Sequence, residues 1–138
     1  MQLNEGLEVL GTDNYTSGVL EGSTVESVIL PSTLRRIEYR AFHNCEKLKS
    51  ISLPEGLEFI GQTCFRQSAL ESVELPASLR MVSQEAFAKC SNLKTVKFSE
   101  GLEVLGVGED TDTDLLCEDA FDRSAIESVQ LPSTWMEI

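Results

Sequence analysis

Residues 48–65 read LKSISLPEGLEFIGQTCF, and the same arrangement of residue types returns along the chain. A leucine or phenylalanine followed by proline or serine marks each return, every 22 or 23 residues until an insertion lengthens the last interval. These dipeptides are Leu30-Pro31, Leu53-Pro54, Leu75-Pro76, Phe98-Ser99 and Leu131-Pro132. A fixed spacing in this range is typical of a solenoid, in which each repeat packs only on its neighbours. The sequence therefore predicts one solenoid domain over residues 1–138.

Each repeat is expected to contain two extended segments and one tight turn. Residues Leu48–Leu53 end in an alternation of apolar and polar side chains, which is typical of a half-buried strand. The proline that follows has no N–H group for a ladder and ends the strand, and Leu57–Ile60 is expected to form a second extended piece. Ala86–Cys90 is expected to form one helical or 3₁₀ turn that carries Phe87 inward.

The phenylalanine of each turn is predicted to stack on its counterparts inside a single core. One repeat has too few apolar side chains to offset the conformational entropy lost when it is ordered, so it needs its neighbours. Strand pairing between repeats would then advance about 4.8 Å at each step. The side chains in this column are Phe42, Phe65, Phe87 and Phe121.

Consecutive repeats also alternate in kind, so that the full period is a pair of repeats. The second and fourth repeats carry Cys45 and Cys90 in a slot where the others carry serine. A column of charged residues changes sign at each step, which favours one register of stacking over its alternatives. Exposed pairs of this kind contribute only about 0–1 kcal/mol each. The column consists of Glu26, Lys49, Glu71, Lys94 and Glu127.

The composition excludes several classes of partner. The net charge of −12 argues against binding to nucleic acid and to anionic membrane surfaces, because both need clustered lysine and arginine. No stretch approaches the roughly 20 apolar residues of a membrane span, and the N-terminus lacks the profile of a signal peptide. Both ends resemble cuts within a repeat array, so we interpret the chain as a fragment whose uncapped ends favour end-to-end self-association.

The four cysteines do not indicate a disulfide framework. Cys45 and Cys90 hold the same slot two repeats apart, roughly 10 Å, which exceeds the limit of about 7 Å for a bridge. Cys64 stands where other repeats have alanine, so these three thiols are predicted to be buried and free. Cys117 borders an insertion and is the one cysteine expected to be exposed or paired, with Cys90 as its candidate partner.

The pattern Leu-x-x-Ile-x-Leu-Pro-x-x-Leu-x-x-Ile-Gly-x-x-Cys-Phe, over residues 48–65, resembles the BspA-like class of leucine-rich repeats. The resemblance covers nearly the whole chain. It implies an α/β solenoid, a right-handed coil with a parallel β-sheet on the concave side and short helical or 3₁₀ turns opposite. It also implies a large protein at the cell surface, or outside the cell, that binds host proteins, matrix proteins or other cells.

The concave strand face is the usual binding surface of such solenoids. Its outward positions in this chain are small and polar and include no aromatic side chain, so a solvated sheet face is the alternative to a binding site. Ile29 is the one exposed apolar candidate. The predicted binding residues are Ile29, Ser52, Glu74, Lys97 and Gln130.

Two insertions, around Thr12–Gly18 and Val107–Cys117, interrupt the repeat and are expected to leave the same edge. The second carries Asp110, Asp112 and Asp114, whose carboxylates have the spacing and hardness that suit calcium. The match to an EF-hand loop then fails, because the turn glycine and the last glutamate are missing. A solvated acidic loop is therefore the main alternative to a calcium site.

Nothing in the sequence indicates catalysis. His43 and Cys45 could be proposed as base and nucleophile, but the cysteine belongs to a core column and the fourth repeat has alanine in place of the histidine. No phosphate loop, zinc-ligand spacing or serine-hydrolase motif is present, so no cofactor is expected. We therefore predict a non-enzymatic module for protein interaction or adhesion. The alternative is a structural spacer or stalk that supports another domain.

Overall fold

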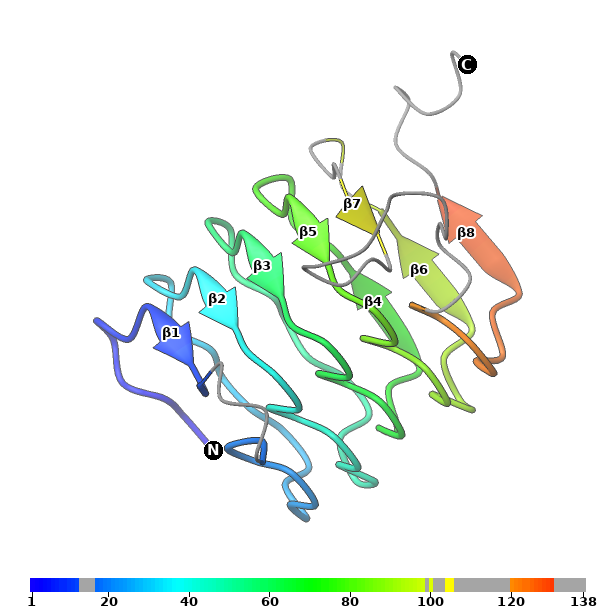
Figure 1. The fold of residues 1–138 in the computed structure, drawn as a ribbon, viewed down its shortest axis with the longest axis horizontal. Coiled ribbons are helices and arrows are strands. Elements are labelled where there is room, and N and C mark those ends of the chain that lie inside the picture. The colour runs from blue at the N-terminus through cyan, green and yellow to red at the C-terminus, as the bar shows by residue number, and fades with distance from the viewer. Residues whose placement is uncertain (13–16, 99, 101–103, 106–119, 131–138) are drawn as a thin grey trace.

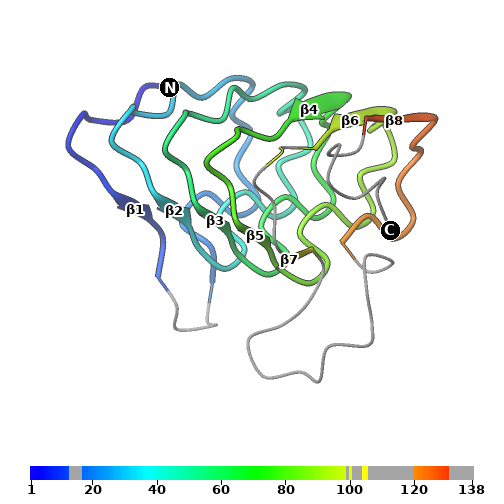
Figure 2. The same ribbon diagram turned by 90° about the horizontal axis from the view of Figure 1, so that it is seen from above.

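A computed structural model describes residues 1–12, 17–98, 100, 104–105 and 120–130. Successive repeats form coils that stack along one axis (Figure 1). We number the coils by residue: 4–30 is the first, 31–53 the second, 54–75 the third, 76–98 the fourth and 99–131 the fifth. Two separate parallel sheets run along the stack, on different sides of the coil (Figure 2). Parallel pairing between repeats is thus confirmed, with two sheets where the sequence predicted one.

The first sheet is built from two-residue strands, one from each coil. Its order is β1-β2-β3-β5-β7, and every neighbouring pair is parallel. In β1 to β5 the second residue of each strand is buried, which ties the register to the core. The strands are β1 (Val9–Leu10), β2 (Arg36–Ile37), β3 (Phe59–Ile60), β5 (Met81–Val82) and β7 (Val104–Leu105).

The second sheet contains β4 (Ser72–Glu74), β6 (Thr95–Lys97) and β8 (Ser128–Gln130). In β4 and β6 the central valine is buried and its neighbours are exposed, as alternation predicts. The strand predicted at Leu48–Leu53 is wrong for its own coil, since those residues form no strand. The N–H of Glu71 still donates to the carbonyl of Lys49, and the backbone then diverges from β4.

The predicted column of phenylalanine rings is confirmed. The centroids of Phe42 and Phe65 lie 5.1 Å apart, those of Phe65 and Phe87 5.2 Å, and those of Phe87 and Phe121 5.3 Å. The interplanar angles are 1°, 7° and 5°, so the rings stack in parallel. Leucine, isoleucine and valine from every described coil join them in one core.

The turn around each phenylalanine is a series of overlapping β-turns, and the expected helical or 3₁₀ turn is wrong. None of the described residues is helical. Every second N–H group of the turn donates to a carbonyl of its own coil and closes a β-turn. The N–H groups between these donate to carbonyls of the next coil. In the second coil the first set runs from Ala41 to Glu38, His43 to Arg40 and Cys45 to Phe42, and the second from Arg40 to Gln62, Phe42 to Cys64 and Asn44 to Arg66. A 3₁₀ helix would need both sets within the coil.

Positive φ angles at fixed places make this turn geometry. One column lies two residues before the phenylalanine, and the other two residues after it or after Leu20, which takes the same slot in the first coil. Such angles favour glycine and, less strongly, asparagine, yet most of these residues are larger. The first column is Arg40, Thr63 and Glu85, with φ of 52–54°, and the second is Gly22, Asn44, Gln67, Lys89 and Arg123, with φ of 56–70°.

The alternation of repeats has a physical basis, because the second and fourth coils reach back to the coils before them. The Gly6 N–H donates to Thr33 Oγ1 (2.9 Å), whose hydroxyl donates to the Leu7 carbonyl (2.8 Å). Ser78 makes the same bridge to the third coil, from the Gly56 N–H (2.8 Å) to the Leu57 carbonyl (2.7 Å). These hydroxyls satisfy backbone groups that strands would otherwise pair.

The cysteine column makes a parallel set of bonds. Cys45 Sγ donates to the Leu20 carbonyl (3.2 Å) and Cys90 Sγ to the Phe65 carbonyl (3.1 Å), again toward the preceding coil. Cys45, Cys64 and Cys90 are buried and free, as predicted. Cys117 lies outside the described residues.

Neighbouring residues of the charged column are joined by backbone hydrogen bonds. The Lys94 N–H donates to the Glu71 carbonyl, and the Glu127 N–H donates to the Lys94 carbonyl. None of the salt bridges among the described residues joins two members of this column. The described members of the column thus lie side by side without direct ion pairs, and that their alternating sign favours one register is still a prediction.

Replacing Phe65 by alanine should cost about 3–5 kcal/mol of unfolding free energy, because its ring is fully buried between two others. Phe59→Ala is the matched control: that ring lies outside the core cluster, under the Arg36 guanidinium at 4.0 Å. We expect a smaller loss there. Unfolding in guanidinium chloride, followed by circular dichroism, measures the loss of unfolding free energy in both variants. Equal losses would contradict a dominant role for the ring stack.

Burial raises the pKa of the Cys64 thiol well above its ordinary value, whereas the thiol of the unfolded chain ionises near pH 8.5. The folded state therefore keeps its proton at high pH, and stability falls as pH rises. Between pH 7.5 and pH 9.5 the unfolding free energy of the unsubstituted chain should fall by about 1 kcal/mol more than that of Cys64→Ala. Alanine fills this slot at Ala41 and Ala86, so the variant suits the fold. Parallel pH profiles of unfolding free energy would refute the expectation.

Candidate interaction surface

Three of the predicted binding residues form one row across the second sheet. Glu74 pairs in register with Lys97, and Lys97 with Gln130. All three side chains are exposed, and Glu74 and Lys97 alternate with inward valines in β4 and β6. The sheet therefore holds an acid, a base and an amide side by side.

The first two members of the row form an ion pair. Lys97 Nζ lies 3.0 Å from Glu74 Oε1, and the two side chains are 52% and 70% exposed. Water screens such a pair, so its contribution to stability is about 0–1 kcal/mol. Because the pair is weak, a partner could replace either half at little cost to the fold.

A groove of about 530 Å³ runs between β4 and the diverging residues 50–53. Ser52, Glu74, Lys97 and Gln130 line it, together with buried apolar side chains that include Leu75 and Phe98. Four of the five predicted residues therefore meet at one concavity.

Ile29 extends this face toward the N-terminus. Its side chain is 61% exposed. It lines a neighbouring hollow of about 440 Å³, to which Ser52 and Glu55 also contribute. Since these two residues line both concavities, the predicted residues lie along one continuous surface. That this surface binds a partner is still a prediction.

Sequence reasoning missed the acidic rim of the groove. Glu55 and Glu100 line it beside Glu74, and among the described lining residues Lys97 is the one cation. The rim was visible as a pattern, because glutamate precedes glycine at Glu5, Glu55 and Glu100, in every second coil. The pattern alone does not place these residues, because they come together only at the corner between the two sheets.

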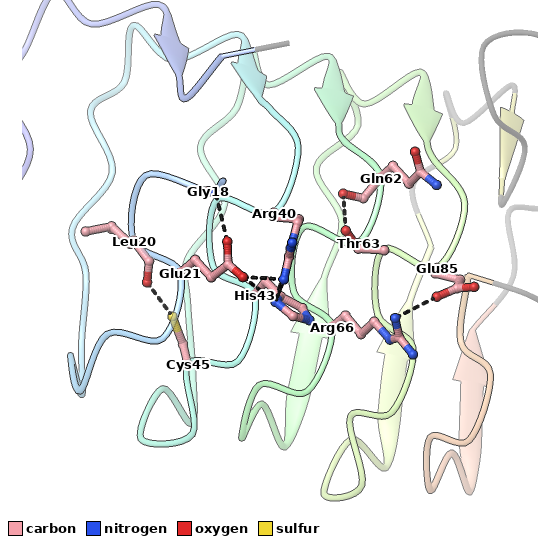
Figure 3. A network of polar contacts seen from close by, with 10 residues as sticks. All are labelled: Gly18, Leu20, Glu21, Arg40, His43, Cys45, Gln62, Thr63, Arg66 and Glu85. Carbon is pink, nitrogen blue, oxygen red and sulfur yellow. Dashed lines mark hydrogen bonds and ion pairs between the residues drawn. The ribbon is translucent and has the colours of Figure 1, made fainter. Parts of the chain in front are cut away.

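A polar cluster lies on the turns of the first and second coils (Figure 3), and none of its residues lines the groove. His43 Nδ1 is 3.1 Å from Glu21 Oε1 and 3.0 Å from Arg40 Nη2, so the ring faces this ion pair. Cys45 instead donates to the Leu20 carbonyl, and burial raises the pKa of its thiol. A cysteine nucleophile needs the opposite environment, one that favours the thiolate. The structure thus builds no Cys45–His43 dyad.

The proposed calcium ligands Asp110, Asp112 and Asp114 lie outside the described residues. Within the part of the chain that is described, no three histidine, cysteine or acidic side chains gather in a way that could hold a metal ion. The same part of the chain contains no helix that could cross a membrane.

On the outward face of the first sheet, the ring of Phe59 is covered by a neighbouring side chain. Phe59 is 7% exposed, and the Arg36 guanidinium covers its ring at 4.0 Å from the centroid. Arg36 Nε also lies 2.6 Å from Glu38 Oε1.

Two solved structures resemble the chain. A leucine-rich repeat protein from Bacteroides ovatus ATCC 8483 gives a TM-score of 0.65 at 18% identity, over 95% of this chain and 37% of that one. A leucine rich cell surface protein from Faecalibacterium prausnitzii A2-165 gives a TM-score of 0.46 at 18% identity, over 96% and 41%. This chain thus spans less than half the length of either. No curated protein matches it.

A family model described as "BspA type Leucine rich repeat region" matches residues 16–138 in six copies. This range holds the phenylalanine column and both sheets apart from β1. The likeness to the Bacteroides ovatus protein shows the same fold. The chain therefore belongs to the BspA-type leucine-rich repeat family, as the pattern at residues 48–65 indicated.

Proposed function

We propose that the chain is a non-enzymatic interaction segment of a longer cell-surface protein, and that it binds a protein partner along the face of β4, β6 and β8. The observation that carries the proposal is the groove in which Ser52, Glu74, Lys97 and Gln130 converge. Family membership supports it, since solenoids of this kind offer extended binding surfaces. A partner that replaces the weak ion pair between Glu74 and Lys97 with its own polar contacts would be recognised specifically.

The charge of the groove indicates the partner's character. Its rim holds three carboxylates, from Glu55, Glu74 and Glu100, against the one ammonium of Lys97. The whole chain carries a net charge of −12, so long-range attraction also favours a basic surface. The surface complementary to this groove is therefore a protein face rich in lysine and arginine.

A second candidate is a spacer that holds another domain away from the cell. The exposed side chains of the second sheet favour it, because they are hydroxyl, amide and charged groups without an aromatic anchor. A spacer would tolerate any substitution on this face that leaves the core intact, whereas an interaction segment would not. One charge reversal separates the two candidates.

The test uses an array of immobilised matrix and host-cell surface proteins, probed with the chain and with Lys97→Glu. An interaction segment should bind at least one protein, and the variant should change its affinity about tenfold or more, which is about 1.4 kcal/mol. Lys47→Glu is the matched control, because it makes the same charge change at an exposed turn residue outside the groove. Unchanged binding by Lys97→Glu, or no binding at all, would favour the spacer.

The basic character of the partner gives an independent measurement. Raising sodium chloride from about 50 mM to about 500 mM should slow association with any bound partner, because salt screens attraction between exposed charges. The double variant Glu55→Gln, Glu100→Gln should weaken this salt dependence while the core is unchanged. Surface plasmon resonance gives the rates. Association that is indifferent to salt would rule out a basic partner without excluding binding itself.

A further inference from the structure

The cluster of Glu21, Arg40 and His43 ties the first coil to the second where the first insertion rejoins the repeat. Glu21 belongs to the first coil, and the other two residues to the turn of the second (Figure 3). Gly18 packs directly on this turn: a Cβ there would fall 1.7 Å from the Arg40 carbonyl oxygen. The cluster thus lies at a close backbone contact between two coils.

The contacts of the cluster converge on one nitrogen atom. His43 Nδ1 lies 3.0 Å from Arg40 Nη2, 3.3 Å from Arg40 Nε and 3.1 Å from Glu21 Oε1. Glu21 also forms a salt bridge with Arg40, and its Oε2 accepts a hydrogen bond from the Gly18 N–H at 2.9 Å. The side chains are only 12%, 29% and 23% exposed for His43, Arg40 and Glu21, so these contacts are partly shielded from water.

The two neighbours require opposite states of the Nδ1 atom. A guanidinium group has only donors, so Arg40 can bond to Nδ1 only when that nitrogen carries no proton. An ionised carboxylate has only acceptors, so Glu21 can bond to it only when it carries one. Both contacts therefore cannot be hydrogen bonds at once. The protonation state of the ring decides which one is made.

We propose that His43 is a proton-controlled switch between Arg40 and Glu21. In the neutral ring the proton is on Nε2, and Nδ1 accepts from Arg40. When the ring gains its second proton, Nδ1 donates to Glu21, and the Arg40 guanidinium loses Nδ1 as an acceptor and faces a like charge, while it keeps its ion pair with Glu21. The link between the two coils, which in the neutral state is the Arg40–Glu21 ion pair, then gains the bond from His43 to Glu21.

Glu21 stays ionised while the His43 ring gains its proton, so the switch involves a single proton. The pKa of Glu21 is lowered, chiefly by the hydrogen bond from the Gly18 N–H and further by His43 and Arg40, although burial opposes this. The carboxylate is thus ionised over the range of about pH 5–8 in which imidazoles titrate. In the third coil Arg66 holds the slot of His43, and its Nη1 pairs with Glu85 Oε2 at 3.3 Å, so that charge has its own partner.

The test reads the tautomer directly, because the chain has a single histidine. Long-range proton–nitrogen correlation spectra of the ¹⁵N-labelled chain at about pH 8.5, where an imidazole is neutral, should show the proton on Nε2. In Arg40→Met, which keeps the aliphatic stem, the neutral ring should carry its proton on Nδ1 and donate to Glu21. A wild-type ring protonated on Nδ1, or the same tautomer in both proteins, would overturn the proposal.

A second variant and a second signal guard against effects of misfolding. Glu21→Gln keeps an acceptor for the Gly18 N–H and leaves Arg40 as the donor, so the neutral ring should stay protonated on Nε2. On acidification of the wild type, the Arg40 Nε–H resonance should shift, and that of Arg36, paired with Glu38 at 2.6 Å, should not. An Arg40 signal that is unmoved when the ring becomes charged would refute the displacement. A merely structural cluster would show neither change of tautomer nor change of signal.

Discussion

The fold depends on the alternate N–H groups of each turn that donate to the next coil. These bonds run along the stack through the same turns that bury the phenylalanine rings, so backbone pairing and ring stacking impose the same spacing. Each β-strand has only two or three residues and would not hold the coils alone. The turns supply a third ladder, and the core between the ladders becomes continuous.

The period, the buried columns and the exposed row could be predicted because each is a property of one residue type at one slot. An inward phenylalanine or cysteine and an outward glutamate are legible from alternation alone. Glu74, Lys97 and Gln130 therefore lie together as the aligned repeats indicated. The acidic rim needed more, because its residues are close only at the corner where the backbone leaves one sheet for the other.

The turn was misjudged for a different reason. Ala86–Cys90 contains good helix formers, and local propensity favours a helical turn. The neighbouring coil offers carbonyl groups to the N–H groups of Phe87 and Lys89, and those bonds require a positive φ at Glu85 and Lys89. Stacking thus overrides propensity at residues whose identity gives no sign of it. The cluster around His43 is equally hard to predict, because Arg40 and His43 follow Glu21 by 19 and 22 residues and meet it only when the coils stack.

Thr33 and Ser78 bond back to the preceding coil, and the described residues form no matching hydroxyl bridge between the second and third coils. Cys45 and Cys90 bond backward across the same interfaces. The stack is consequently a series of doublets, each with two kinds of polar clasp inside it. Deleting a single coil would place two coils of the same kind next to each other. The hydroxyl bridge and the cysteine bond of the broken doublet would then lose their usual partner coil. Natural or engineered changes in the length of such an array should therefore proceed by even numbers.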